Sequence, residues 1–221
     1  MDYRTVTRGE GPMEKRKSLK NTIYEAILSG IYQDKYKPEE ILTEQSLVES
    51  FGVSKAPVRE ALLTLCNEGV LKNLPRLGYE VVKLTTNDVK EVLRFRCILE
   101  CGCLEEICGK LTKEQLDTLQ QLNKLCCSQA SSENMQTHWQ HNEAFHLQLI
   151  AYAGNAYAYQ QLARSLTLLR RAYSQFYWDK WTPSIISMDM KSHKPLIEAL
   201  VRNDLDRAKH FLKEDLADFG Y

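Results

Sequence analysis

The sequence predicts a mainly α-helical protein in two parts: a small N-terminal domain of three helices and a β-hairpin, then an all-helical bundle. Two observations support this fold class. Two short β-rich runs between residues 70 and 84 flank a Pro-Arg-Leu-Gly loop, which is typical of a hairpin. From Thr86 onward, every periodic segment has the helical period. We therefore divide the chain into a polar arm without periodicity and two domains: residues 1–17, 18–84 and 85–221.

The N-terminal domain begins with an amphipathic helix over residues 19–31. Thr43 is a suitable N-cap for a short second helix, which ends at Gly52. Ser54 can cap a third helix, and Gly69 stops it. The order helix, helix, turn, helix, hairpin is that of a winged helix-turn-helix.

The C-terminal domain contains only helical patterns. Its second helix opens with a capping box at Thr112. The expected helices are 86–108, one from Thr112, 133–153, 156–178, one from Pro183 to 202, and a last one ending near Phe219.

The composition is that of an ordinary globular protein, with 26% charged residues and a net charge of zero. A neutral chain has no overall field that would attract nucleic acid or an acidic membrane. No apolar run approaches the ~20 residues that span a bilayer, and the N-terminus lacks the apolar core of a signal peptide. We therefore expect a cytoplasmic protein without a membrane partner.

The seven cysteines leave two interpretations open. No pair has the C-x-x-C spacing of zinc or redox sites. Cys97, Cys101 and Cys108 lie on one stripe of a predicted helix, which favours reduced thiols acting as small core residues. A thiol sensor or a disulfide is the alternative.

The first turn of the third helix carries polar and cationic side chains. In a helix-turn-helix, the second helix lies in the major groove and its N-terminal residues reach bases and phosphates. Ser54, Lys55 and the free N–H groups of this turn can hold a phosphate, and Arg59 can bind guanine O6 and N7. Arg76, at the hairpin tip, can enter a neighbouring groove or hold a phosphate. The alternative is a solvated helix end.

The stretch "ILTEQSLVESFGVSKAPVREALLTLCNEGVL", followed by "LGYEV", resembles the DNA-binding domain of the GntR family of transcriptional regulators. The resemblance covers residues 19–82 and implies a homodimer that binds a palindromic operator in double-stranded DNA. Gln45 and Lys55 stand where the family usually has Arg, and Ala56 where Thr is common, which changes the expected operator sequence. By motif position, the implied DNA contacts are Gln45, Ser54, Lys55, Ala56, Pro57, Arg59, Leu77 and Gly78.

Three helices of the second domain each place polar groups among apolar residues. Asn142 and His146 share one helix face, while His193 and Asp215 lie on the apolar stripes of two later helices. Buried polar groups need partners, so we expect these four to face one another. Two imidazoles, an amide oxygen and a carboxylate suit Zn²⁺, Ni²⁺ or a similar ion. The alternative is hydrogen-bonded core residues; His138 is a reserve ligand or a surface residue.

The segments "EVLRFRCILE", "NEAFHLQLIAYAGN" and "HKPLIEALVRNDLDRAKHFLKEDL" resemble the FCD domain, the helical effector domain of the FadR branch. In that branch an Asp and three His commonly hold a metal, beside which a small carboxylate effector binds. The matching positions are Asn142, His146, His193 and Asp215, so Asn142 replaces the Asp and Asp215 the last His. Arg96 is implied to bind the effector, the alternative being an intrahelical pair with Glu100.

These observations predict a dimeric transcriptional regulator that is not an enzyme and whose helical domain binds a small organic acid beside a divalent metal. A thiol-based redox regulator is one alternative. A metal-dependent hydrolase using His146, His193 and Asp215 is another. It lacks an evident general base and leaves the winged domain without a role.

Overall fold

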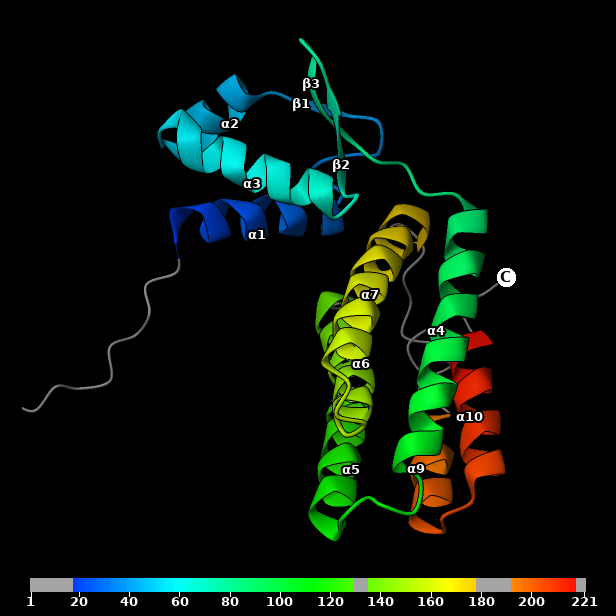
Figure 1. Ribbon diagram of the computed structural model, residues 1–221. Helices are drawn as coiled ribbons and strands as arrows, with labels where there is room; N and C mark the ends of the chain where they lie inside the picture. Colours follow the sequence, from blue (N-terminus) through cyan, green and yellow to red (C-terminus); the bar gives the residue numbers. More distant parts are fainter. Residues whose placement is uncertain (1–17, 129–134, 178–191, 218–221) are drawn as a thin grey trace, which may run out of the picture.

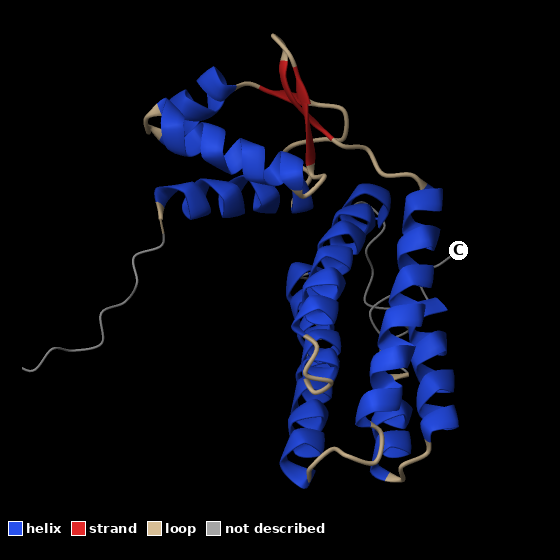
Figure 2. Ribbon diagram, viewed as in Figure 1, coloured by secondary structure: helices blue, strands red, loops and turns tan. Residues whose placement is uncertain are grey.

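The computed structural model describes residues 18–128, 135–177 and 192–217. A small domain with three helices and a three-stranded sheet lies across one end of an elongated helical bundle (Figures 1 and 2). The fold is thus mainly helical with a small antiparallel sheet, as the sequence predicts. Among the described residues, no helix combines the length and apolar character needed to cross a membrane.

The helices of the small domain begin and end where local sequence signals place them. Ser18 caps α1 (Leu19–Tyr32) and Thr43 caps α2 (Glu44–Phe51), each accepting a hydrogen bond from a first-turn N–H. Gly52 has a φ of 64°, a left-handed conformation that favours glycine, and it turns the chain from α2 into α3 (Lys55–Asn67). Ser54 occupies the N-cap position of α3, but its side chain makes no capping bond, so that part of the prediction is wrong.

The wing is a three-stranded antiparallel sheet in the order β1-β3-β2, formed by β1 (Ile41–Leu42), β2 (Leu71–Leu74) and β3 (Gly78–Val81). The sequence predicts the β2–β3 hairpin but not β1. Glycine is required at position 78, where β3 lies against β1, because a Cβ added there would lie 2.5 Å from the Leu42 carbonyl oxygen. The helices of this domain pack their apolar faces around one core that includes Ile27, Leu62 and Leu65.

The bundle comprises α4 (Thr86–Ile107), α5 (Lys113–Ser128), α6 (Met135–Ala151), α7 (Ala156–Tyr177), α9 (His193–Val201) and α10 (Leu205–Ala217). The capping box of Thr112 with Gln115 forms as predicted, and Thr85 with Asp88 forms a second one at the start of α4. The predicted helix from Pro183 is described only from His193 onward. The arm over residues 1–17 and the predicted helix end near Phe219 lie outside the described residues.

Helix α7 connects the bundle to the small domain. Its Arg171 side chain is 4% exposed and donates hydrogen bonds from Nη1 to the Gly69 carbonyl and from Nη2 to the Val82 carbonyl, each at 3.0 Å. Ser174 Oγ donates to the Tyr32 carbonyl at 2.6 Å. The end of α1, the turn after α3 and the end of the wing are therefore all attached to one helix of the bundle (Figure 1).

Candidate DNA-binding surface and metal centre

The first turn of α3 presents the predicted DNA contacts on an open surface. Ser54, Lys55, Ala56 and Arg59 are exposed, and Pro57 is half-buried. Leu62 and Leu65, further along the same helix, are fully buried in the core of the small domain. The buried face therefore fixes α3 in place, while its polar start stays open to a ligand.

Glu44, a residue that the sequence analysis did not select, contacts this surface from α2. Its carboxylate lies 3.2 Å from Lys55 Nζ and 3.8 Å from Arg59 Nε, and it accepts a hydrogen bond from the Tyr79 hydroxyl at 3.1 Å. Burial and, after it, this hydrogen bond raise the pKa of Tyr79. One half-buried carboxylate thus links the two predicted DNA-binding cations to the wing. Gln45 is exposed, and its amide donates to Glu49.

The tip of the wing carries the remaining predicted contacts. Arg76 and Leu77 are exposed, Leu77 at 62%, and Gly78 begins β3. Arg76 has a φ of 69°, as a tight turn requires. The tip projects from the small domain on the side away from the bundle (Figure 1). No described residue of the bundle therefore covers the wing contacts.

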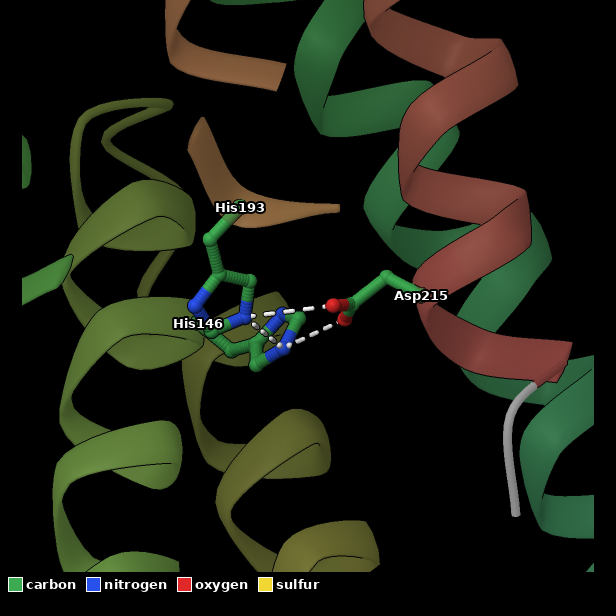
Figure 3. A group of neighbouring side chains, drawn as sticks. All are labelled: His146, His193 and Asp215. Carbon is green, nitrogen blue, oxygen red and sulfur yellow. Dashed lines mark hydrogen bonds and ion pairs between the residues drawn. The ribbon is translucent and has the colours of Figure 1, made fainter. Parts of the chain in front are cut away.

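In the bundle, His146 from α6, His193 from α9 and Asp215 from α10 converge (Figure 3). One ligand atom from each lies within 4.8 Å of the others. His146 Nε2 lies 3.1 Å from Asp215 Oδ2 and 3.4 Å from His193 Nε2, which in turn lies 3.3 Å from Asp215 Oδ1. All three side chains are at most 4% exposed. The ring of Phe145 stacks on His193, with centroids 3.9 Å apart, and fixes its plane.

Glu100 on α4 sets the orientation of His146. The Nδ1–H of His146 donates to Glu100 Oε2 at 2.7 Å, which leaves Nε2 directed at His193 and Asp215. Burial lowers the pKa of His146, but Glu100 and Asp215 outweigh it and raise that pKa to about 9. Desolvation opposes ionisation of Asp215, yet the two imidazoles hold its pKa well below the usual range. The cluster is therefore a strongly coupled polar group inside an apolar bundle.

The donor set fits a divalent cation. It offers two imidazole nitrogens and a carboxylate, a mixture that Zn²⁺ and Ni²⁺ accept. Asn142, one turn before His146, is 8% exposed, and within the described part of the chain its Oδ1 is buried without a hydrogen-bond partner. Such an oxygen is available as a fourth ligand. His138 is fully buried, so its interpretation as a surface residue is wrong.

Arg96 forms the intrahelical pair with Glu100 that the sequence offers as the alternative to effector binding, with 2.7 Å between Nε and Oε1. The arginine is 3% exposed and the glutamate fully buried. Burial works to raise the pKa of Glu100, but Arg96 and His146 lower it. Nη2 of Arg96 is buried and, within the described ranges, has no hydrogen-bond partner. The intrahelical pair therefore uses only one side of the guanidinium.

Burial makes several of the described thiols less acidic than a free cysteine. Cys66, Cys97, Cys101, Cys103 and Cys108 are free. Burial raises the pKa of Cys66, Cys103 and Cys108. Thiols with a raised pKa react slowly with peroxide, because the thiolate is the nucleophile. This chemistry does not favour a rapid redox sensor.

Comparison with known proteins identifies both parts of the chain. Residues 19–81 match the family of bacterial regulatory proteins called gntR, and residues 91–218 match the FCD domain. The HTH-type transcriptional repressor GlaR of Escherichia coli K12 is 24% identical over 87% of this chain and 90% of its own length. YdhC of Bacillus subtilis 168, an HTH-type transcriptional regulator, is 35% identical, but over only 44% of this chain and 43% of its own.

Solved structures share the architecture. E. coli McbR/YncC superposes with a TM-score of 0.77 at 22% identity, covering 90% of this chain and 94% of its own. A GntR regulator from Rhodococcus sp. RHA1 gives 0.73 at 19% identity, over 91% and 95%.

The matched families and relatives are transcriptional regulators and not enzymes, so the hydrolase alternative is wrong. The start of α3 and the wing lie within the gntR match, and the cluster of His146, His193 and Asp215 lies within the FCD match. The chain is therefore a DNA-binding transcriptional regulator of the gntR family with an FCD effector-binding domain.

Proposed function

We propose that this regulator is a homodimer whose FCD domain holds one divalent cation and a small organic anion, and that this binding changes its affinity for a palindromic operator. The observation that carries the proposal is the convergence of His146, His193 and Asp215 inside the bundle. A protein that binds operators works beside the chromosome, in the bacterial cytoplasm.

The metal ligands would be His146, His193 and Asp215, with Asn142 as the fourth. Zn²⁺ and Ni²⁺ are the favoured ions, because borderline cations accept imidazole together with carboxylate. Glu100 supports this assignment, since a carboxylate on Nδ1 is the usual partner of a metal-binding histidine. The ion would supply positive charge and a coordination position for an anionic ligand.

The charges of the site favour an anionic effector. With neutral imidazoles, a divalent cation and Arg96 contribute three positive charges, and Glu100 and Asp215 contribute two negative ones. A buried net charge is costly, so one added carboxylate would neutralise the site. Nη2 of Arg96, which has no hydrogen-bond partner among the described residues, is a suitable donor to that carboxylate.

A chain of contacts leads from this site to the DNA-binding domain. Glu143, next to Asn142 on α6, lies 3.6 Å from Arg170 Nη1 on α7. The Arg170 guanidinium stacks over the Tyr32 ring of α1, 4.3 Å from its centroid. The neighbouring Arg171 holds the turn after α3 and the end of the wing. A shift of α6 on ligand binding would therefore move the surface that contacts DNA.

The proposal as a whole is tested by operator affinity measured with and without Zn²⁺ and a panel of small carboxylates. The operator would first be selected from random duplex DNA. We expect one carboxylate to change operator affinity roughly 5- to 150-fold, and operator to change affinity for that carboxylate by the same factor. An effector that binds equally well with and without operator would exclude the coupling.

Replacing Arg171 with alanine should uncouple the two domains. The substitution removes two hydrogen bonds to backbone carbonyls and leaves Gly69 and Val82 without these donors. We expect the ligand-dependent change in operator affinity to fall toward onefold, while metal binding is retained. Fluorescence anisotropy with labelled operator measures the ratio of operator affinities with and without the ligand.

Arg164→Ala is the matched control, because Arg164 is an exposed arginine on the same helix. It should retain the full coupling. If Arg171→Ala keeps the coupling as well, the signal does not pass through this contact.

The dimer contact is assigned to the outer face of α4. Ile98 is 69% exposed and Phe95, three residues earlier, 42% exposed, so two large apolar side chains lie together on one surface. A contiguous exposed apolar patch is typical of a protein–protein contact. Leu99 and Cys103, on the adjoining face, pack against α7 and fix the orientation of α4.

Ile98→Asp should convert the dimer to a monomer, because it places a charge inside this contact. Light scattering coupled to size exclusion measures the mass. Val201→Asp, at a 51% exposed valine of α9, is the control and should remain dimeric. If the Ile98→Asp protein remains dimeric, the dimer contact lies on another surface.

A further inference from the structure

Cys97 and Cys101 form a pair of neighbouring thiols on α4. They lie one helical turn apart, and Cys97 is close enough to Cys101 to raise the pKa of its thiol. Both are half-buried, so solvent reaches them. The pair therefore combines proximity with access, which a small reagent or ion requires.

The surroundings of the pair come from α4 and α10. Cys97 and Cys101 of α4 pack against the apolar core that includes Leu212 of α10, and α4 and α10 lie side by side (Figure 1). Lys209 and Lys213 of α10 are close enough to act electrostatically on Cys101. Lys209 also pairs with Glu105, which joins the two helices at this level. Two cations thus act on the Cys101 sulfur and would favour its thiolate form once a ligand is bound.

The geometry disfavours a disulfide between these thiols. Cβ atoms four residues apart in a helix are about 5–6 Å apart, whereas a relaxed disulfide needs about 3.5–4.5 Å. Closing the bond would distort α4. A single larger atom placed between the two sulfurs can bond to both of them without distorting α4.

The kind of atom follows from the donors. Thiolates prefer soft centres. Two sulfurs cannot complete the four-coordinate sphere of zinc. They do suffice for a centre of low coordination number, such as Cu⁺ or an organic arsenic(III) group. Burial and the neighbouring Cys97 raise the pKa of Cys101 to about 11, so binding at neutral pH releases the thiol proton.

We propose that Cys97 and Cys101 form a dithiol site that binds one soft, thiophilic centre at the seam between α4 and α10. Phenylarsine oxide is the probe. Two S–H bonds break and two As–S bonds form, and the oxide oxygen leaves as water with both protons. Arsenic stays trivalent, so the step needs no oxidant or reductant.

The test uses the full-length reduced protein and intact mass spectrometry. We expect one arsenical per chain, removed by excess ethanedithiol. Cys97→Ser and Cys101→Ser should each weaken binding about a hundredfold or more, because the second As–S bond is intramolecular only when both thiols are present. Cys66→Ser and Cys103→Ser are controls that should bind as the parent does.

A second measurement needs no variant. The bound arsenical should shield Cys97 and Cys101 of the parent protein from iodoacetamide, as mapped by peptide mass spectrometry. The adjacent Cys126 and Cys127 are the competing pair. The proposal is overturned if the arsenical shields that pair instead, or if the adduct is lost only in Cys126→Ser/Cys127→Ser. It is also overturned if the parent protein takes up no arsenical.

Discussion

In a His146→Ala/His193→Ala protein, bound divalent metal should fall to background, and added Zn²⁺ should no longer raise the melting temperature. Both imidazoles direct Nε2 at Asp215, so their removal leaves one carboxylate and one amide, too few donors for a borderline ion. In the parent protein, Zn²⁺ at a hundred times its dissociation constant should stabilise the fold by about 2.7 kcal/mol. For a protein of this size, that corresponds to roughly 5–10 °C.

Element analysis of protein purified without chelator, together with thermal melts, measures both effects. His210→Ala is the control, because His210 is exposed, pairs with Glu214 and lies outside the cluster. It should keep both the metal and the thermal shift. If the parent protein holds no more metal than the double variant, and neither Zn²⁺ nor Ni²⁺ raises its melting temperature, the cluster is a polar effector pocket without a metal.

The same site predicts an opposite pH dependence for the metal-free and metal-bound forms. The pKa of His146 rises from 6.5 to about 9 on folding, so its contribution to stability is fully present below pH 6.5 and is lost as the pH rises through about 9. A metal replaces the proton on Nε2, so metal affinity instead increases with pH over this range. The rise in melting temperature caused by Zn²⁺ should therefore be larger at pH 9 than at pH 6.5.

Arg59→Ala should lower operator affinity by about 1–3 kcal/mol, roughly 5- to 150-fold, and relax the preference at one base position. Arg59 is exposed one turn into α3, and the buried face of that helix holds it against the core of the small domain. An arginine in the major groove binds guanine through two parallel hydrogen bonds, and alanine can form neither.

Anisotropy at one fixed salt concentration, with the selected operator and single-base variants of it, measures affinity and preference together. Arg202→Ala is the control, since it removes the same charge from an exposed position of the bundle. If Arg59→Ala binds the operator as tightly as the control does, α3 does not enter the groove in the predicted way.

Local signals and resemblance were sufficient for much of the molecule. Thr43, Gly52 and the Thr112 capping box act on the backbone within a few residues, so their effect is visible in the sequence. The convergence of His146 and His193 was predictable because each lies on an apolar helix face, and buried polar groups need partners.

Features that depend on the placement of distant segments were missed. β1 is two residues long and exists only because β3 pairs with it. Glu44 and Glu100 were overlooked as functional because each acts through partners on other elements. A signal for Glu100 was present, since an apolar stripe of α4 that includes Leu104 and Ile107 carries two charged residues, Arg96 and Glu100.

Glu44 has a further consequence for how the protein searches a genome. Its carboxylate is an internal counterion for Lys55 and Arg59. These side chains therefore release fewer of the counterions that are condensed on random DNA. Nonspecific DNA binding derives almost entirely from counterion release, whereas specific binding adds base contacts. An internal carboxylate therefore weakens nonspecific binding more than specific binding, which raises the ratio of specific to nonspecific affinity. This ratio decides occupancy of the operator when about 10⁶ or more nonspecific sites compete for the protein. Because its net charge is also zero, this protein should spend less time bound to nonspecific DNA than a variant that lacks the Glu44 carboxylate.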